Sequence, residues 1–119
     1  MFAWLTKRII ARLPSRREAV ALTRVSSRGL DFQQANGRQT LIPWDAIERV
    51  MATVSTQLVG DTQILVFGLA SGGSAIATEA DPAWTALTEQ LHLHLVGATR
   101  ATMWQLELLA GKPVEVYRR

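Results

Sequence analysis

The residues best suited to chemistry are His92 and His94, the only histidines in the chain. Imidazole nitrogens bind metal ions and transfer protons near neutral pH. Two positions apart on the helix predicted for this region, the two side chains point in well-separated directions. A metal site needs three or four ligands, and no third ligand lies nearby in sequence. We interpret both as ordinary surface histidines of a helix and expect no metal and no cofactor.

Motifs for a nucleophile or a bound phosphate are missing from the sequence. The chain has no cysteine, and none of its serines lies in a G-x-S-x-G motif. Residues 68–73, GLASGG, lack the lysine and hydroxyl of a phosphate loop, and residues 110–113, AGKP, have a lysine without that loop. Both stretches are typical of turns. Since no catalytic set is complete, we do not expect an enzyme.

Other polar and aromatic candidates have structural interpretations. Asp45, Glu48 and Asp61 stand at the ends of predicted elements, where capping and solvation explain them. Trp44 and Trp84 each precede an apolar residue by three positions, which is the spacing of one helical face. We therefore expect both tryptophans to anchor the core rather than to stack on a ligand.

Basic charge is concentrated at the start of the chain. The first 24 residues hold six basic side chains and one acidic one, a net charge of +5, whereas the other 95 hold seven basic and nine acidic, a net charge of −2. Wound at about 100° per residue, residues 1–13 form an amphipathic helix with Phe2, Leu5, Ile9 and Leu13 on one face. Pro14 then ends the helix.

This N-terminal segment has two alternative roles. Its apolar face could pack on the rest of the domain with the arginines solvated, or it could bind an anionic membrane or a partner's groove. Trp4, which lies off the apolar arc, favours the second role. Nucleic acid is a weaker expectation, since the charge sits on one short helix. The candidate contact residues are Phe2, Trp4, Leu5, Lys7, Arg8, Ile9, Arg12, Arg16 and Arg17.

The rest of the chain has the pattern of short strands joined by turns. Strands are predicted at residues 20–25, 30–34, 38–42, 48–56, 62–70 and 75–78. Asn36 and Gly37 predict a type I′ hairpin turn. The strand at 62–70 is apolar on both faces, as expected of a strand covered on both sides.

The stretch LIPWDAIERV, residues 41–50, carries helix and strand signals together. The simplest interpretation is a strand that ends at Pro43, one helical turn from Trp44 to Ile47 capped by Asp45, and a strand that resumes near Glu48.

Helical signals dominate the C-terminal third. Asp81 and Pro82 predict a helix start, with Asp81 as the N-cap and Pro82 in the first helical position. Gly97 would end that helix. A short helix at 101–109 and a short strand at 113–117 would follow. The face of the first helix would bury Trp84, Leu87, Leu91 and Leu95.

A family resemblance follows from these elements. Gly29-Leu30 opens a strand, Asn36-Gly37 turns it, and Ile42-Pro43-Trp44-x-x-Ile47-x-x-Val50 comes next. In that order these features resemble the small bacterial pleckstrin-homology-like (PH-like) proteins, over about residues 18–96. The resemblance implies an α+β fold: a small antiparallel barrel of about seven strands closed by a C-terminal amphipathic helix, here with an extra N-terminal helix. It also implies binding to proteins, lipids or membranes, without a common activity.

Together these observations predict an N-terminal helix at 1–14 and a PH-like domain at 15–119. The expected function is a non-enzymatic interaction module that binds a protein partner or a second copy of itself. Peripheral membrane binding and an immunity or adaptor role are the alternatives. Because the chain lacks cysteine and a long apolar run, we expect a cytoplasmic protein, with the inner membrane face as the alternative location. No small-molecule ligand follows from the sequence.

Overall fold

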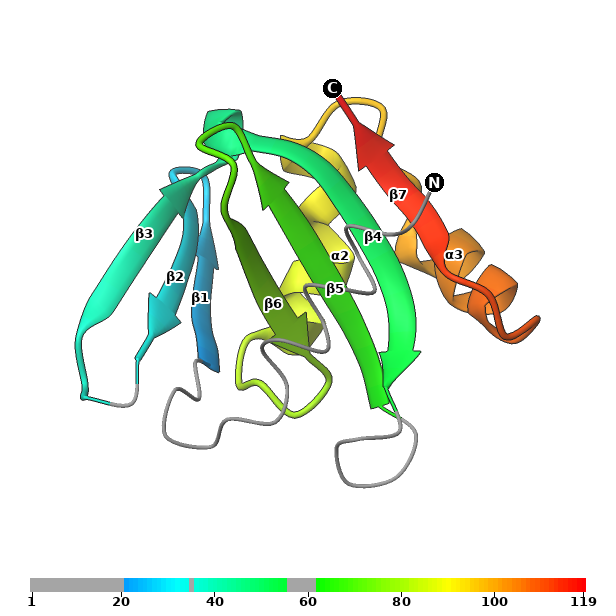
Figure 1. Ribbon diagram of the computed structural model, residues 1–119, viewed down its shortest axis with the longest axis horizontal. Coiled ribbons are helices and arrows are strands. Elements are labelled where there is room, and N and C mark those ends of the chain that lie inside the picture. Colours follow the sequence, from blue (N-terminus) through cyan, green and yellow to red (C-terminus); the bar gives the residue numbers. More distant parts are fainter. Residues whose placement is uncertain (1–20, 35, 56–61) are drawn as a thin grey trace.

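The computed structural model describes residues 21–34, 36–55 and 62–119. Within these ranges the protein is α+β, with two antiparallel sheets and two α-helices (Figure 1). The first sheet has three strands in the order β1-β2-β3: β1 (Ala21–Ser26), β2 (Gly29–Gln33) and β3 (Gln39–Pro43). The predicted N-terminal helix at 1–14 lies outside these ranges.

The second sheet has four strands in the order β6-β5-β4-β7. A 3-10 turn, η1 (Trp44–Ala46), leads from the first sheet into it, and helices α2 and α3 precede its last strand. Figure 1 shows both helices behind this sheet. The elements are β4 (Ile47–Ser55), β5 (Thr62–Leu69), β6 (Ser74–Thr78), α2 (Trp84–His94), α3 (Ala101–Leu108) and β7 (Val114–Arg118).

The expected closed barrel is wrong, because the strands form two separate sheets. β4 pairs with β5 along one edge and with β7 along the other, so it has no edge left for β3. Pro43, which lacks an N–H, ends β3, and η1 then turns the chain away from the first sheet. β1 lies beside β6 without a strand pairing between them. Nor does α2 end the chain, since α3 and β7 follow it.

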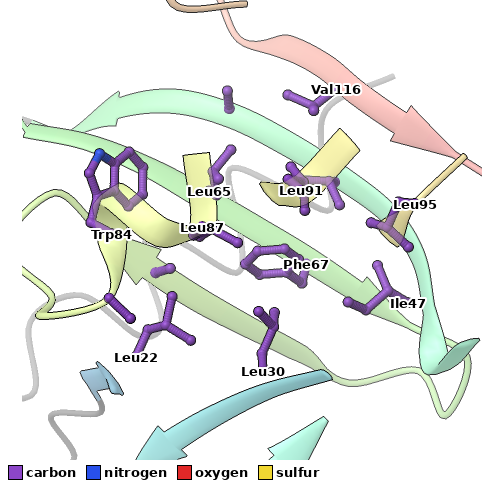
Figure 2. Close-up of a cluster of buried hydrophobic side chains, with 14 of the residues drawn as sticks. Leu22, Leu30, Ile47, Leu65, Phe67, Trp84, Leu87, Leu91, Leu95 and Val116 are labelled. Carbon is purple, nitrogen blue, oxygen red and sulfur yellow. The ribbon is translucent and has the colours of Figure 1, made fainter. Parts of the chain in front are cut away.

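One hydrophobic core lies between the two sheets and the helices. Figure 2 shows Phe67 of β5 with Leu30 of β2 and Leu87 of α2 around it, and all three side chains are fully buried. The predicted helical stripe is confirmed, because all four of its members belong to this core. Burial of each large apolar side chain contributes about 1.5–3 kcal/mol. The core therefore joins two sheets that share no backbone ladder.

Trp44 connects the two sheets at the end of the molecule where η1 lies (Figure 1). Its ring is buried in the core with Ile47 and Val50, as the sequence predicted. Its Nε1 donates a 2.8 Å hydrogen bond to the carbonyl of Ser26 at the end of β1. The ring also stacks on His94 at the end of α2, with centroids 4.7 Å apart. A single side chain thus contacts the first sheet, the second sheet and a helix.

A second connection lies at the start of α2. The N–H of Ala83 donates to the carbonyl of Leu22 in β1 at 3.2 Å. Asp81 turns back toward β6, where its carboxylate accepts from the N–H of Thr78 at 3.0 Å. The predicted N-cap and Pro82 start are therefore wrong: α2 begins at Trp84, after Ala83, with no side-chain cap. The Asp81 carboxylate is used to close the turn instead.

Two further turn predictions need correction. The β2–β3 hairpin is confirmed, but its turn is not type I′, because Gly37 has φ 86° and no described non-glycine residue has positive φ. Gln34 donates to the Arg38 carbonyl at 2.8 Å and closes a longer loop. The helical turn at Trp44 is confirmed, whereas the predicted Asp45 cap is wrong, since η1 has no side-chain cap.

Gly29 supplies a close approach that no other residue permits. It has φ 153° and pairs with Pro43 at the β2–β3 ladder. A Cβ at this position would collide with the carbonyl oxygen of Ile42 and lie 2.8 Å from the Cα of Pro43. The glycine that opens the PH-like pattern is therefore required by backbone packing.

We predict that Gly29→Ala lowers the free energy of unfolding by about 2–4 kcal/mol, because strain and collision add. Gly37→Ala is the matched control, since Gly37 also has positive φ but has open space around it. It should cost only about 1 kcal/mol. Urea denaturation of both variants measures the difference, and equal losses would contradict the collision.

We predict that Trp44→Ala lowers the free energy of unfolding by about 3–5 kcal/mol, as removal of a buried tryptophan typically does. Trp44→Phe keeps an aromatic ring but loses the bond to Ser26, so it should cost about 1–2 kcal/mol. Thermal and urea denaturation measure both. An unchanged melting temperature in Trp44→Ala with loss of binding would make Trp44 a recognition residue.

Candidate functional site

The contact residues predicted at the N-terminus cannot be placed. All nine lie between residues 2 and 17, outside the residues that the structure describes. The candidate site must therefore come from the surface of residues 21–119, where sequence reasoning did not look for it.

Five large apolar side chains are exposed along the end of α2, the following loop and α3. They account for most of the exposed large apolar residues in the described ranges. The exposed fraction is 66% for Leu93, 55% for Met103 and 63% for Leu106. We call this set the helical apolar surface: Leu93, Val96, Met103, Leu106 and Leu109.

Helix geometry explains why these side chains face outward. In α3 the core side chains are Trp104 and Leu108, and Met103 and Leu106 lie on the opposite side of the helix. In α2 Leu93 likewise lies opposite the buried stripe. The edge-to-face contact of Trp84 with Trp104, at 6.3 Å between ring centroids, holds the two helices side by side. Both helices cover one face of the same sheet, so their outer sides form one surface (Figure 1).

A sequence signal for this surface exists but was not used. The stretch MWQLELL, residues 103–109, carries apolar residues at more positions than one buried face needs. A surface helix of this length buries one stripe, so the additional apolar residues indicate a second contact. Without the position of the sheet, however, the sequence alone does not say which residues form the outer side.

Charged residues of both signs border the helical apolar surface. Glu89 of α2 and Glu107 of α3 are exposed, and so are Arg100 and Lys112 in the flanking loops. Among the described residues none of these four forms a salt bridge, since the one found there joins Arg118 to Glu115. The rim is therefore free to pair with charges on another molecule.

The histidines do not form a metal site in the described part of the chain. No group of three or more His, Cys, Asp or Glu residues lies close enough there to hold an ion. The interpretation of His94 as an ordinary surface histidine is wrong, because its ring stacks on Trp44. His92 is half-buried, and its Nδ1 is buried without a hydrogen-bond partner.

A groove at the end of the second sheet contains three arginines. Arg49, Arg118 and Arg119 line it together with Gly72 and Gly73. Arg118 donates to Glu115 at 2.7 Å, Arg119 donates to the carbonyl of Asp45 at 2.7 Å, and Arg49 also interacts within the protein. These contacts hold the C-terminus against β4 and η1. The groove is thus explained by intramolecular bonds.

Comparison with protein-family models, with curated proteins and with solved structures found no match to this chain. None of the helices in the described residues has the length and apolar content needed to cross a membrane.

Two carboxylates have shifted pKa values of opposite direction. Burial raises the pKa of Asp81, although hydrogen bonds from the backbone N–H groups of Thr78 and Leu22 act against this. The hydrogen bond from Arg118 lowers the pKa of Glu115, which lies at the surface. A raised pKa means that the folded state binds the proton more tightly than the unfolded state, and a lowered pKa means the reverse.

These directions predict opposite pH dependences. The contribution of Asp81 should become more favourable to folding as the pH falls toward the ordinary carboxyl range, whereas the contribution of Glu115 should be lost there. Urea denaturation of Asp81→Asn and Glu115→Gln at pH 6.5 and pH 4 tests this. The stability of the parent chain relative to Asp81→Asn should increase at pH 4, and relative to Glu115→Gln it should decrease. The same trend in both pairs would contradict the assignment.

Proposed function

We propose that this protein is a non-enzymatic, PH-like interaction module that binds a protein partner through the helical apolar surface. The observation that carries the proposal is the exposure of Leu93, Met103 and Leu106 on two adjacent, well-packed helices. Contiguous exposed apolar surface with a polar rim is characteristic of protein-binding sites. No set of catalytic side chains competes with this interpretation in the described residues.

The PH-like resemblance supports the proposal through the order of elements. A glycine-started strand, a hairpin, the Pro43-Trp44 turn and a long β4 follow one another, and α2 comes after β6. Trp44 and Gly29 have structural roles, so the resemblance rests on packing rather than on a shared site. The open arrangement of two sheets and the additional α3 and β7 depart from the pattern. Notably, the helical apolar surface lies largely on that additional part.

A second copy of the chain is the partner that the surface fits best. In a two-fold symmetric interface each residue of one copy faces its counterpart region in the other, so the surface must complement itself. Apolar side chains at the centre and unpaired charges of both signs at the rim meet this requirement. Burying these apolar side chains would supply most of the driving force. An immunity or adaptor role would use the same surface on another protein.

We predict that the full chain self-associates and that Leu106→Asp abolishes this, because a carboxylate at the centre of an apolar interface is desolvated without a partner. Sedimentation velocity over a range of concentrations should show a species larger than the 13.1 kDa monomer for the parent chain. Leu106→Asp should raise the dissociation constant at least tenfold while the melting temperature stays within about 2 °C, since surface changes rarely alter stability by more than about 0.5 kcal/mol.

Thr85→Asp is the matched control, because Thr85 is exposed on α2 away from the apolar side chains. It should associate like the parent chain. A parent chain that stays monomeric at every concentration, or a Leu106→Asp chain that associates unchanged, would contradict the proposal.

Reversible membrane binding through residues 1–17 is the competing outcome. The net charge of +5 in residues 1–24 favours it, because each basic side chain near an anionic surface contributes about 1 kcal/mol. Sedimentation with phosphatidylserine-containing vesicles tests it beside neutral phosphatidylcholine vesicles. Strong retention on the anionic vesicles alone by a monomeric chain would favour the membrane over the protein partner.

A further inference from the structure

The second sheet buries apolar side chains on the face away from the helices. Met51 of β4 and Ile64 and Val66 of β5 are each 0% exposed, yet none belongs to the core cluster. Met51 pairs directly with Val66, and Val66 pairs with Ile76 of β6. We call Met51, Ile64, Val66 and Ile76 the outer sheet face.

Strand alternation confirms that this face is distinct from the core. Leu65 and Phe67 of β5 lie in the core, so Ile64 and Val66 point to the other side of the sheet. Gln63, which shares the side of Leu65, accepts a hydrogen bond from Gln105 of α3 at 3.1 Å. The helices are therefore on the core side. Figure 1 shows no labelled helix or strand over the opposite face.

Complete burial of these side chains requires a cover, and chain length restricts what can supply it. Outside the described ranges lie residues 1–20, residue 35 and residues 56–61. Residue 35 is in the distant β2–β3 loop. A six-residue loop between β4 and β5 can fold back by only about 10 Å, because extended chain spans about 3.3 Å per residue. Val66 lies four residues beyond the start of β5, or roughly 13 Å from it.

The N-terminal residues meet the requirement in length and in starting point. The described chain begins at Ala21 in β1, which lies beside β6 at the edge of the second sheet. Four strands are about 14 Å across, and thirteen helical residues extend about 20 Å. The residues between such a helix and Ala21 are enough to bring it from the edge onto the face.

The chemistry of the segment also fits. An apolar face needs an apolar occupant, and residues 1–13 offer Phe2, Leu5 and Ile9 at helical spacing. The basic side chains Lys7, Arg8 and Arg12 fall outside or at the border of that stripe, so docking leaves them in water. We propose that residues 1–13 bind the outer sheet face through Phe2, Leu5 and Ile9. This choice settles the two alternatives for the segment in favour of packing within the chain.

Thiol accessibility in the full-length chain tests the proposal. Because the protein contains no cysteine, each introduced cysteine is a single probe. Val66→Cys changes the side-chain volume little and should react slowly with a maleimide reagent, whereas Leu93→Cys on the helical apolar surface should react quickly. Adding Leu5→Asp should speed the labelling of Val66→Cys at least tenfold. Adding Lys7→Asp, the matched control, should leave it unchanged.

Further arms exclude the other covers. Ala77→Cys, which is buried in the core on the opposite side of the sheet, should stay protected when Leu5→Asp is added. Equal opening at Ala77→Cys would contradict the proposal, because Leu5 would then support the whole core. Continued protection of Val66→Cys in the Leu5→Asp chain would also overturn it. Protection that disappears on dilution would assign the outer sheet face to a second copy instead.

Discussion

The packing of Trp44 between the two sheets is the interaction on which the rest of the structure depends. The sheets share no ladder hydrogen bond, so only side-chain packing and a few cross-links make them one unit. Trp44 contributes to both: its ring enters the common core, its Nε1 binds the Ser26 carbonyl, and its face stacks on His94. The bond from Ala83 to Leu22 connects β1 at the other end. These contacts also fix where α2 ends and hence where the outer side of the helices lies.

Local patterns predicted most of the elements and the core. Alternation, turn residues and helical spacing gave the seven strands, η1, α2 and α3 close to their observed bounds, because each of these signals acts within a few residues. Closure could not be obtained in the same way. Whether β4 pairs with β3 or with β7 depends on two segments some seventy residues apart, and nothing local in 113–117 indicates its partner strand. The family pattern, which ends before α3, pointed to a barrel for the same reason.

Polar side chains at turns were the least predictable feature. Asp45 and Asp81 both stand where a cap is expected, and neither caps a helix. Asp81 binds Thr78 because β6 ends next to it, a contact that depends on the position of a strand and not on the helix that follows. His94 was assigned to the surface for a similar reason, since its stacking partner Trp44 is fifty positions away. The exposed apolar residues of α3 remained unassigned until the buried side of that helix was known.

The two sheets, the core and the helices should therefore unfold as one cooperative unit. Native-state hydrogen exchange of the full chain at rising, sub-denaturing urea concentrations measures this most directly. The central strands β2 and β5 are the appropriate reporters, one from each sheet. If Trp44 and the shared core join the sheets, the amides of both strands should exchange with the same free energy of opening at each urea concentration. Opening of β2 at a clearly lower free energy, with β5 still protected, would contradict the account by showing that the three-stranded sheet unfolds alone.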